Sequence, residues 1–289
     1  MKKYEITNET ICVNGKSLLN EKTLYRIKSL IDFGDVTQGT LGGFIEKESN
    51  LSHDGNAWVY DDAMVYDNAC VYGNAKVCGN AMIYGDAKIC DDAEVYGNAK
   101  VGCNAKVYDD AMVYDNARVR DNAKVRGDAE VYSNAKLCDN AKVGCNAMIY
   151  GDAKICDDAE VYGSANVWGN AKVCDDARVC GDAEVYDDAI VCGNAKVYGN
   201  AKLCDNAWVC DDAKVRGNDD CLYFKGLGSH NRTTAFFKCR GGHIQVSCGC
   251  FHGNLVEFEN QVRETHGDTK YAKEYLVCVT LVKIHFGIE

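Results

Sequence analysis

The sequence of 289 residues contains no proline, no long apolar run and no excess of basic residues. No stretch approaches the roughly 18 apolar residues that a membrane helix needs, so no membrane association is predicted. The N-terminus, Met1–Glu5, becomes acidic at once and lacks an apolar core, so we predict no secretory signal and expect a cytoplasmic protein. A formal net charge of −11 argues against a nucleic-acid partner, because phosphate binding needs a basic surface.

A six-residue repeat, Asn/Asp–Ala–x–Val–x–x, occupies positions 56–217 without an insertion. Alanine occurs at Ala57 and at every sixth position to Ala213, which makes 27 units, and an aliphatic residue lies two positions after each alanine. A helix would scatter these alanines around its surface, whereas in a strand the alanine and the aliphatic residue point to the same side. The last two positions of a repeat, usually Gly or Asp followed by Asn or Asp, favour a sharp corner. Each six-residue repeat is therefore predicted to form a short strand and a corner, and it must stack on other copies of itself.

This pattern resembles the hexapeptide-repeat family of left-handed parallel β-helices, which have an aliphatic residue every six positions and a small residue two before it. In that family three six-residue repeats form one triangular coil, so the resemblance implies about nine coils. The resemblance also implies that the β-helix is left-handed. The stretch Asp32–Ile45 and the first repeat, Asn56–Asp61, also resemble the N-terminal part of YdcK-like hexapeptide proteins. The second resemblance implies a cap that leads directly into the first coil.

We therefore expect a mainly β protein with three domains: an N-terminal β cap at 1–55, the β-helix at 56–217 and a small α+β module at 218–289. In the last module we expect three strands and two helices. Strands are predicted at Cys221–Lys225, Thr233–Lys238 and His243–Ser247, followed by a helix that begins with a capping box at Asn254–Glu257 and ends at Gly267.

Residues 18 positions apart should stack, which predicts a column of aromatic side chains on one face of the β-helix. The candidate binding residues in this column are Tyr96, Tyr114, Tyr132, Tyr150, Trp168 and Tyr186. Two interpretations stay open. The column is either a binding and self-association surface or the ordinary packing of aromatic side chains on a flat parallel sheet.

Two sets of cysteines are candidates for metal binding. A second column on the β-helix contains Cys138, Cys156, Cys174, Cys192 and Cys210. A straight line of thiols is not a tetrahedral cage, so packing is the favoured interpretation. In the C-terminal module the candidates are Cys239, His243, Cys248, Cys250 and His252, whose spacing departs from common zinc motifs. We therefore predict no metal and no cofactor.

Histidine is absent between His53 and His230, although acyltransferases of the hexapeptide-repeat family use a histidine as general base. The block Met82–Gly97 also recurs unchanged at Met148–Gly163, and an offset of 66 residues places the two copies on different faces. These observations predict a non-enzymatic bacterial or phage scaffold. Its C-terminal module would bind a protein partner, and its flat aromatic face a second copy of the chain.

Two alternatives to the scaffold remain. One is an acyltransferase-like enzyme whose histidines come from the C-terminal module. The other is an acidic, phage-type decoy that inhibits a host protein, because aspartates gather at the predicted corners of the coils.

Overall fold

The computed structural model describes residues 2–14, 21–210, 212–230, 232–239 and 242–288. Two compact units make up the chain, Met1–Asp152 and Ala153–Glu289. Their boundary falls inside the six-residue repeat, so it does not bear on the division into a cap, a β-helix and a C-terminal module, which stays a prediction.

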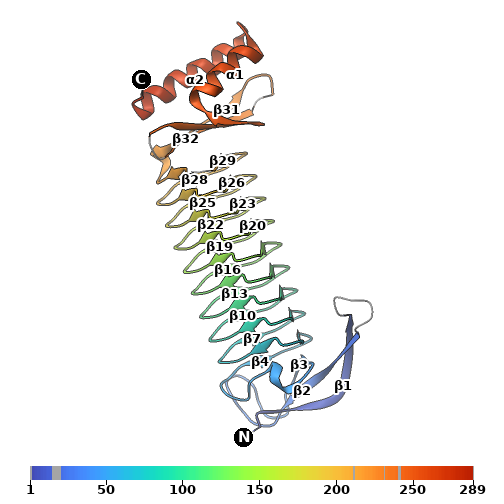
Figure 1. Cartoon of the computed structure of the whole chain (residues 1–289). Coiled ribbons are helices and arrows are strands. Elements are labelled where there is room, and N and C mark those ends of the chain that lie inside the picture. Colours follow the sequence, from blue (N-terminus) through green and yellow to red (C-terminus); the bar gives the residue numbers. More distant parts are fainter. Residues whose placement is uncertain (1, 15–20, 211, 231, 240–241, 289) are drawn as a thin grey trace. The chain divides into compact units, whose positions relative to one another are not determined.

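The first unit begins with an antiparallel sheet. Strand β1 (Tyr4–Asn14) pairs with β2 (Glu21–Ser29), and β2 pairs with β3 (Leu41–Ile45), which the short 3-10 helix η1 (Glu48–Asn50) follows. Strand β3 then pairs in parallel with β5 of the coils, with Ile45 opposite Val65. The N-terminal strands therefore continue one face of the β-helix and lie at the start of its coils (Figure 1).

Two-residue strands recur every six residues after this cap. In the first unit they are β4 (Trp58–Val59), β5 (Met64–Val65), β6 (Cys70–Val71), β7 (Lys76–Val77), β8 (Met82–Ile83), β9 (Lys88–Ile89), β10 (Glu94–Val95), β11 (Lys100–Val101), β12 (Lys106–Val107), β13 (Met112–Val113), β14 (Arg118–Val119), β15 (Lys124–Val125), β16 (Glu130–Val131), β17 (Lys136–Leu137), β18 (Lys142–Val143) and β19 (Met148–Ile149). In the second unit they are β20 (Lys154–Ile155), β21 (Glu160–Val161), β22 (Asn166–Val167), β23 (Lys172–Val173), β24 (Arg178–Val179), β25 (Glu184–Val185), β26 (Ile190–Val191), β27 (Lys196–Val197), β28 (Lys202–Leu203), β29 (Trp208–Val209) and β30 (Lys214–Val215).

Within each unit, a strand pairs in parallel with the strand three further along the chain, so three strands complete one coil. Val59 lies opposite Val77, for example, and Val173 lies opposite Val191. The repeated alanines from Ala57 to Ala213, and the aliphatic residue that follows each of them, are at most 2% exposed. The predicted stacking and interior are therefore confirmed. Burial of the aliphatic side chains, each worth about 1.5–3 kcal/mol, drives the stacking.

The backbone conformation at the corners explains why either Gly or Asp usually occupies the same repeat position. Asp109 and Gly127, one coil apart, have φ values of 60° and 64°, a left-handed conformation that most residues avoid. An aspartate at this position also accepts a hydrogen bond from the backbone of the next coil. One such bond runs from the Asp175 N–H to Asp157 Oδ2 at 3.4 Å, and another from the Gly193 N–H to Asp175 Oδ2 at 2.9 Å. A corner with such an aspartate therefore links two coils.

The second unit ends in a four-stranded antiparallel sheet and two helices. After the 3-10 helix η2 (Asn218–Asp220) come β31 (Cys221–Leu227), β32 (Arg232–Lys238), β33 (Ile244–Cys248), β34 (Phe251–Asn254), α1 (Leu255–His266) and α2 (Lys270–Phe286). The Asn254 capping box and the end of α1 at Gly267 are as predicted. The prediction of three strands was wrong, because the short strand β34 pairs with β33 directly before α1.

The two faces of this sheet have different neighbours. On one face, Gln245 Nε2 donates to Cys210 Sγ at 2.9 Å and Tyr223 Oη donates to the Lys202 carbonyl oxygen at 3.0 Å, so this face covers the last coil. On the other face, Phe236 and Val246 form an apolar core with α1 and α2. The helices therefore lie on the side of the sheet that faces away from the coils (Figure 1).

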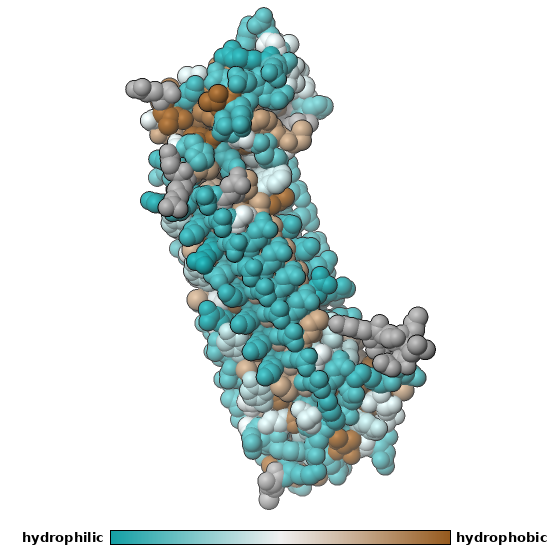
Figure 2. Space-filling model, in the orientation of Figure 1, coloured by the Kyte–Doolittle hydropathy of each residue, from teal (hydrophilic) through white to brown (hydrophobic). Residues whose placement is uncertain are grey.

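The fold class is the one predicted, a mainly β chain with a single-stranded, left-handed parallel β-helix, an N-terminal β cap and a small C-terminal α+β region. The visible face of the coils is mostly hydrophilic (Figure 2). Among the described residues, neither helix is long and apolar enough to cross a membrane. A cytoplasmic location stays a prediction.

Candidate functional site

The predicted aromatic column forms stacked rings within each unit. In the first unit, the rings of Tyr96 and Tyr114 are 4.8 Å apart, those of Tyr114 and Tyr132 are 4.8 Å apart, and those of Tyr132 and Tyr150 are 5.0 Å apart. The interplanar angles are at most 7°. In the second unit, Trp168 and Tyr186 stack at 4.5 Å.

This stacking limits what the aromatic column could bind. The flat faces of neighbouring rings cover one another, so the ring edges and hydroxyl groups remain for a partner. Tyr114 Oη already donates to Glu130 Oε2 at 2.7 Å, and burial together with this carboxylate raises the pKa of Tyr114. The assignment of these residues as a binding surface stays a prediction, and the stacking itself stabilises the coils.

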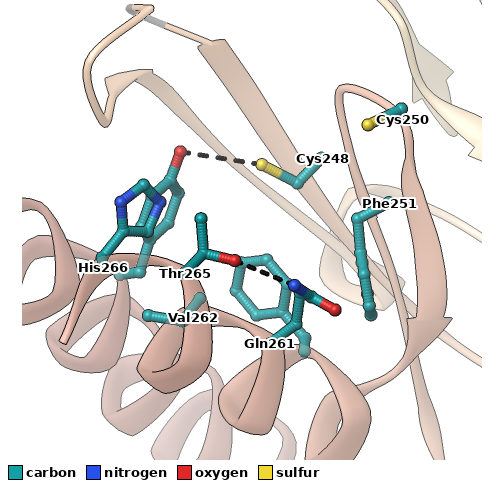
Figure 3. A pocket seen from close by; sticks show the side chains of 9 residues that line it. Cys248, Cys250, Phe251, Gln261, Val262, Thr265 and His266 are labelled. Carbon is teal, nitrogen blue, oxygen red and sulfur yellow. Dashed lines mark hydrogen bonds between the residues drawn. The ribbon is translucent and has the colours of Figure 1, made fainter.

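A better-formed cavity lies in the C-terminal α+β region, where α1, α2 and the turn between β33 and β34 meet. Its volume is about 350 Å³. The residues that line it are Cys248, Cys250, Phe251, Phe258, Gln261, Val262, Thr265, His266 and Tyr275. Figure 3 shows His266 and Phe251 on opposite sides of this pocket. Aromatic and aliphatic walls with a few polar groups are typical of small-molecule sites.

The polar groups of the pocket are held by hydrogen bonds from several elements. Cys248 Sγ, buried at the end of β33, accepts a hydrogen bond from Thr234 Oγ1 at 3.1 Å and contacts Tyr275 Oη at 3.8 Å. The ring of His266 stacks on that of Tyr275, with centroids 5.7 Å apart. An imidazole, a phenol and a thiol therefore lie close together at one cavity.

His266 is the histidine best placed to transfer a proton. Within the described part of the chain, its imidazole has ring contacts and no hydrogen bond, so neither nitrogen is committed to another side chain there. In contrast, His53 Nδ1 accepts the Lys3 backbone N–H at 3.2 Å while its Nε2 lies 3.2 Å from Glu48 Oε1. Both nitrogens of His53 are therefore in use, and its role is structural.

The five candidate metal ligands of the C-terminal module lie on different sides of its sheet. Cys248 faces the helices, whereas His252 contacts the Trp208 ring of a coil at 3.9 Å between centroids. Cys250 is exposed, and Cys239 Sγ lies 3.7 Å from Gln245 Oε1 on the coil side. His243 is exposed before β33. Among the described residues, these side chains form no group of three possible ligands that could share an ion.

Comparison with known proteins found one curated relative of interest. The chain is 36% identical over 63 residues to "Uncharacterized acetyltransferase YdcK" from Escherichia coli, which corresponds to 21% of this chain and 19% of the relative. The chain thus spans about a fifth of the length of the curated relative that it matches. This similarity confirms the predicted resemblance to YdcK-like proteins. No family model matches the sequence.

Among solved structures, one match is LpxA from Acinetobacter baumannii, with 15% sequence identity and a TM-score of 0.33. It covers 60% of this chain and 71% of LpxA.

The prediction of a non-enzymatic scaffold was wrong, because the curated relative is an acetyltransferase by name. Histidine is indeed absent from the coils between His53 and His230. In the C-terminal α+β region, however, His266 lines a pocket. The acyltransferase alternative agrees better with these findings.

Sequence reasoning also missed most of the pocket. Cys248 and Cys250 were identified as metal candidates, but Gln261, Thr265 and His266 were not identified at all. These three lie on the polar side of α1, and a helical pattern alone does not show that this side borders a cavity. The available signal was the spacing from Gln261 to Thr265, which places the two side chains 2.8 Å apart on one helix face.

Proposed function

We propose that this hexapeptide-repeat β-helix protein is an acyltransferase whose acceptor binds in the pocket between α1, α2 and the β33–β34 turn. The observation that carries the proposal is the free imidazole of His266 at the wall of a 350 Å³ cavity that also presents a phenol and thiols. The similarity of a 63-residue segment to a protein named as an acetyltransferase supports the same reaction class.

In the proposed reaction, His266 acts as general base. Its imidazole takes the proton from an acceptor hydroxyl or amine, which attacks the carbonyl carbon of an acyl thioester such as acetyl-CoA. A carbon–oxygen or carbon–nitrogen bond forms, the carbon–sulfur bond breaks, and the proton passes from the imidazolium to the departing thiolate, which leaves as a thiol. Stacking on Tyr275 fixes the orientation of the imidazole during both proton transfers.

The apolar walls define the acceptor that fits. Phe258 and Val262 are buried, and Phe251 is half-buried, so a ligand with an apolar or aromatic portion would displace water from this side. Gln261 and Thr265 at the rim offer hydrogen bonds to a polar group. We therefore propose an acceptor with one reactive hydroxyl or amine attached to an apolar body.

The test incubates the purified full chain with acetyl-CoA and a panel of such amines and alcohols. Release of CoA and formation of the acetylated acceptor are both measured by chromatography, because thiol-reactive dyes would also react with the 18 cysteines of the chain. Loss of a general base lowers the rate by about 10²–10⁴-fold, which is the effect expected for His266→Gln. His243→Gln is the matched control, since His243 is exposed and does not line the pocket.

The results show whether the chain transfers an acetyl group and whether His266 takes part. Acetyl transfer that falls in His266→Gln and persists in His243→Gln supports both the reaction and its site. Equal rates in the wild type and His266→Gln would place the reaction elsewhere. If the wild type acetylates no acceptor in the panel, the proposed function is contradicted.

Self-association through the flat aromatic face is a second proposal, and the edges of the stacked tyrosines carry it. Sedimentation velocity over a range of protein concentrations tests it directly. We expect a species larger than the monomer that is weakened by Tyr132→Ala; a strictly monomeric profile at every concentration would refute it.

A further inference from the structure

A group of metal-ligand side chains lies on the β-helix of the second unit, away from the pocket. The thiols of Cys156 and Cys174 and a carboxylate oxygen of Asp157 all lie within 4.8 Å of one another. Cys156 and Cys174 are each 5% exposed, and Asp157 is exposed at the adjoining corner. The two sulfurs are thus sheltered, and one side of the group is open to solvent.

The backbone fixes the separation of the two thiols. Ile155 lies opposite Val173 in the parallel pair β20–β23, and the Cys156 N–H donates to the Val173 carbonyl oxygen at 3.0 Å. The cysteines that follow these residues therefore occupy equivalent positions in successive coils. Their separation is set by the spacing of about 4.8 Å between neighbouring strands, which is a property of the fold.

This spacing selects a coordination geometry. With metal–sulfur bonds of about 2.3 Å, a linear two-coordinate ion separates its sulfurs by about 4.6 Å, whereas a tetrahedral ion separates them by about 3.8 Å. The strand spacing matches the linear case without movement of the backbone. Two in-line thiolates suit soft cations, because thiolate ligands select Cu(I) over the hard divalent ions.

Both basic and acidic side chains surround the thiols. Lys172 interacts electrostatically with both Cys174 and Cys156, and the carboxylates of Asp157 and Asp175 interact with Cys174. A monovalent cation with two thiolates carries a net charge of −1, which the Lys172 ammonium offsets and the two carboxylates increase. Both thiol protons pass to solvent on binding, and no electron transfer is involved.

We propose that Cys156 and Cys174 bind one soft monovalent cation, of the class of Cu(I) and Ag(I), in a linear arrangement between two coils. Asp157 lies beside the pair and contributes a weaker, third contact from the corner. The carboxylate also accepts the Asp175 backbone N–H at 3.4 Å, which holds it in position near the sulfurs.

The test is a titration of the full chain with Ag(I) and Cu(I) without oxygen, in the presence of a phosphine reductant and a competing chelator. Native mass spectrometry counts the bound ions, and X-ray absorption counts the sulfur ligands. We expect the most tightly bound ion to have two sulfur ligands. It should be lost in both Cys156→Ser and Cys174→Ser, with at least a tenfold weaker apparent affinity for the first ion.

Two cysteines provide matched controls. Cys180 occupies the same repeat position on another face, and Cys192 follows Cys174 in the same column, so Cys180→Ser and Cys192→Ser should both retain the tightest equivalent. Thermal unfolding of the metal-free variants checks that all four fold. A first equivalent that survives in Cys174→Ser, or that is lost equally in Cys180→Ser, would overturn the proposal.

Discussion

Asp109 Oδ2 accepts a hydrogen bond of 3.1 Å from the backbone N–H of Gly127, which is 18 residues later in the sequence and one coil further along the β-helix. Both residues have the same left-handed backbone conformation. The aspartate therefore adopts the left-handed conformation of its own corner and also accepts a hydrogen bond from the next corner. Similar bonds join other corners, such as that from the Ser133 N–H to Asp115 Oδ2 at 3.2 Å.

Replacement of Asp109 should separate these two contributions. Asp109→Ala loses the hydrogen bond and places a side chain that disfavours φ near 60° at the corner, so we expect the free energy of unfolding to fall by about 1–3 kcal/mol. Asp109→Asn keeps an acceptor oxygen and tolerates the conformation, and it should stay within about 0.5 kcal/mol of the wild type. Urea denaturation measures both. Equal losses in the two variants would show that the corner does not depend on these properties.

Gly127 should resist substitution by alanine, which disfavours a left-handed backbone. A Cβ at this position would lie 2.9 Å from the Cys145 backbone nitrogen, and the φ of 64° adds strain. We expect Gly127→Ala to cost about 1–3 kcal/mol of unfolding free energy.

Gly144 in the same unit is the control for this substitution. Its φ is ordinary, and a Cβ there would meet the flexible side chain of Arg126 at 3.2 Å rather than backbone atoms. Gly144→Ala should change the unfolding free energy by less than about 0.5 kcal/mol. A similar cost for both glycines, in the same urea denaturation, would argue against the corner as the cause.

The stacked tyrosines should contribute to stability whether or not they bind a partner. Tyr114 stacks on Tyr96 and Tyr132, so Tyr114→Ala removes two aromatic contacts and should cost about 1–3 kcal/mol. Tyr114→Phe keeps the stack and loses the hydrogen bond to Glu130, with an expected cost of about 0.5–1.5 kcal/mol. Thermal unfolding distinguishes the two. Tyr114→Ala as stable as the wild type would contradict a structural role.

The stability of the first unit should fall at alkaline pH. Burial raises the pKa of Cys78 to about 11 and that of Cys90 to about 11, above the value of about 8.5 for an unfolded cysteine. Because the folded pKa is the higher one, the stabilising effect of these protonated thiols is complete below the unfolded pKa and disappears as the pH rises through 11. We expect the unfolding free energy to decrease between about pH 9 and pH 11.

Cysteine variants identify the source of this pH dependence. Denaturation under reducing conditions at pH 7.5, 9.0 and 10.5 should give a shallower decline for Cys78→Ser, because serine does not titrate in this range. Cys12 is exposed, and Cys12→Ser should decline as steeply as the wild type. The same slope in all three proteins would exclude Cys78 as a contributor.

The β-helix could be predicted from the sequence because its determinants are local and repeated. A period of six fixes which side of each strand is buried, and Val59 opposite Val77 follows directly from three strands per coil. The corner residues add a second, independent signal, since Gly and Asp supply the required backbone conformation. Strand β34 could not be predicted in this way, because Phe251–Asn254 is short, contains a glycine and leads directly into α1.

The pocket was harder to predict because it depends on packing between elements distant in the sequence. Cys248 and Tyr275 meet across the sheet–helix interface, 27 residues apart, and no pattern in either segment specifies that contact. The possible metal ligands in the coils illustrate a different limit. Cys156 and Cys174 were expected to stack, but the position of Asp157 beside them depends on the side-chain geometry of the corner.

The N-terminal cap has a consequence for how the protein is made. Tyr4 Oη lies within hydrogen-bonding distance of the carbonyl oxygens of Glu48, at 2.9 Å, and Leu51, at 2.8 Å, so the start of the coils is covered by residues that are synthesised before the coils. Each later turn of this unit then needs just the preceding one as its template. Translation and folding can therefore proceed in the same direction, and the growing edge is extended by newly synthesised chain before it can recruit a strand from another molecule.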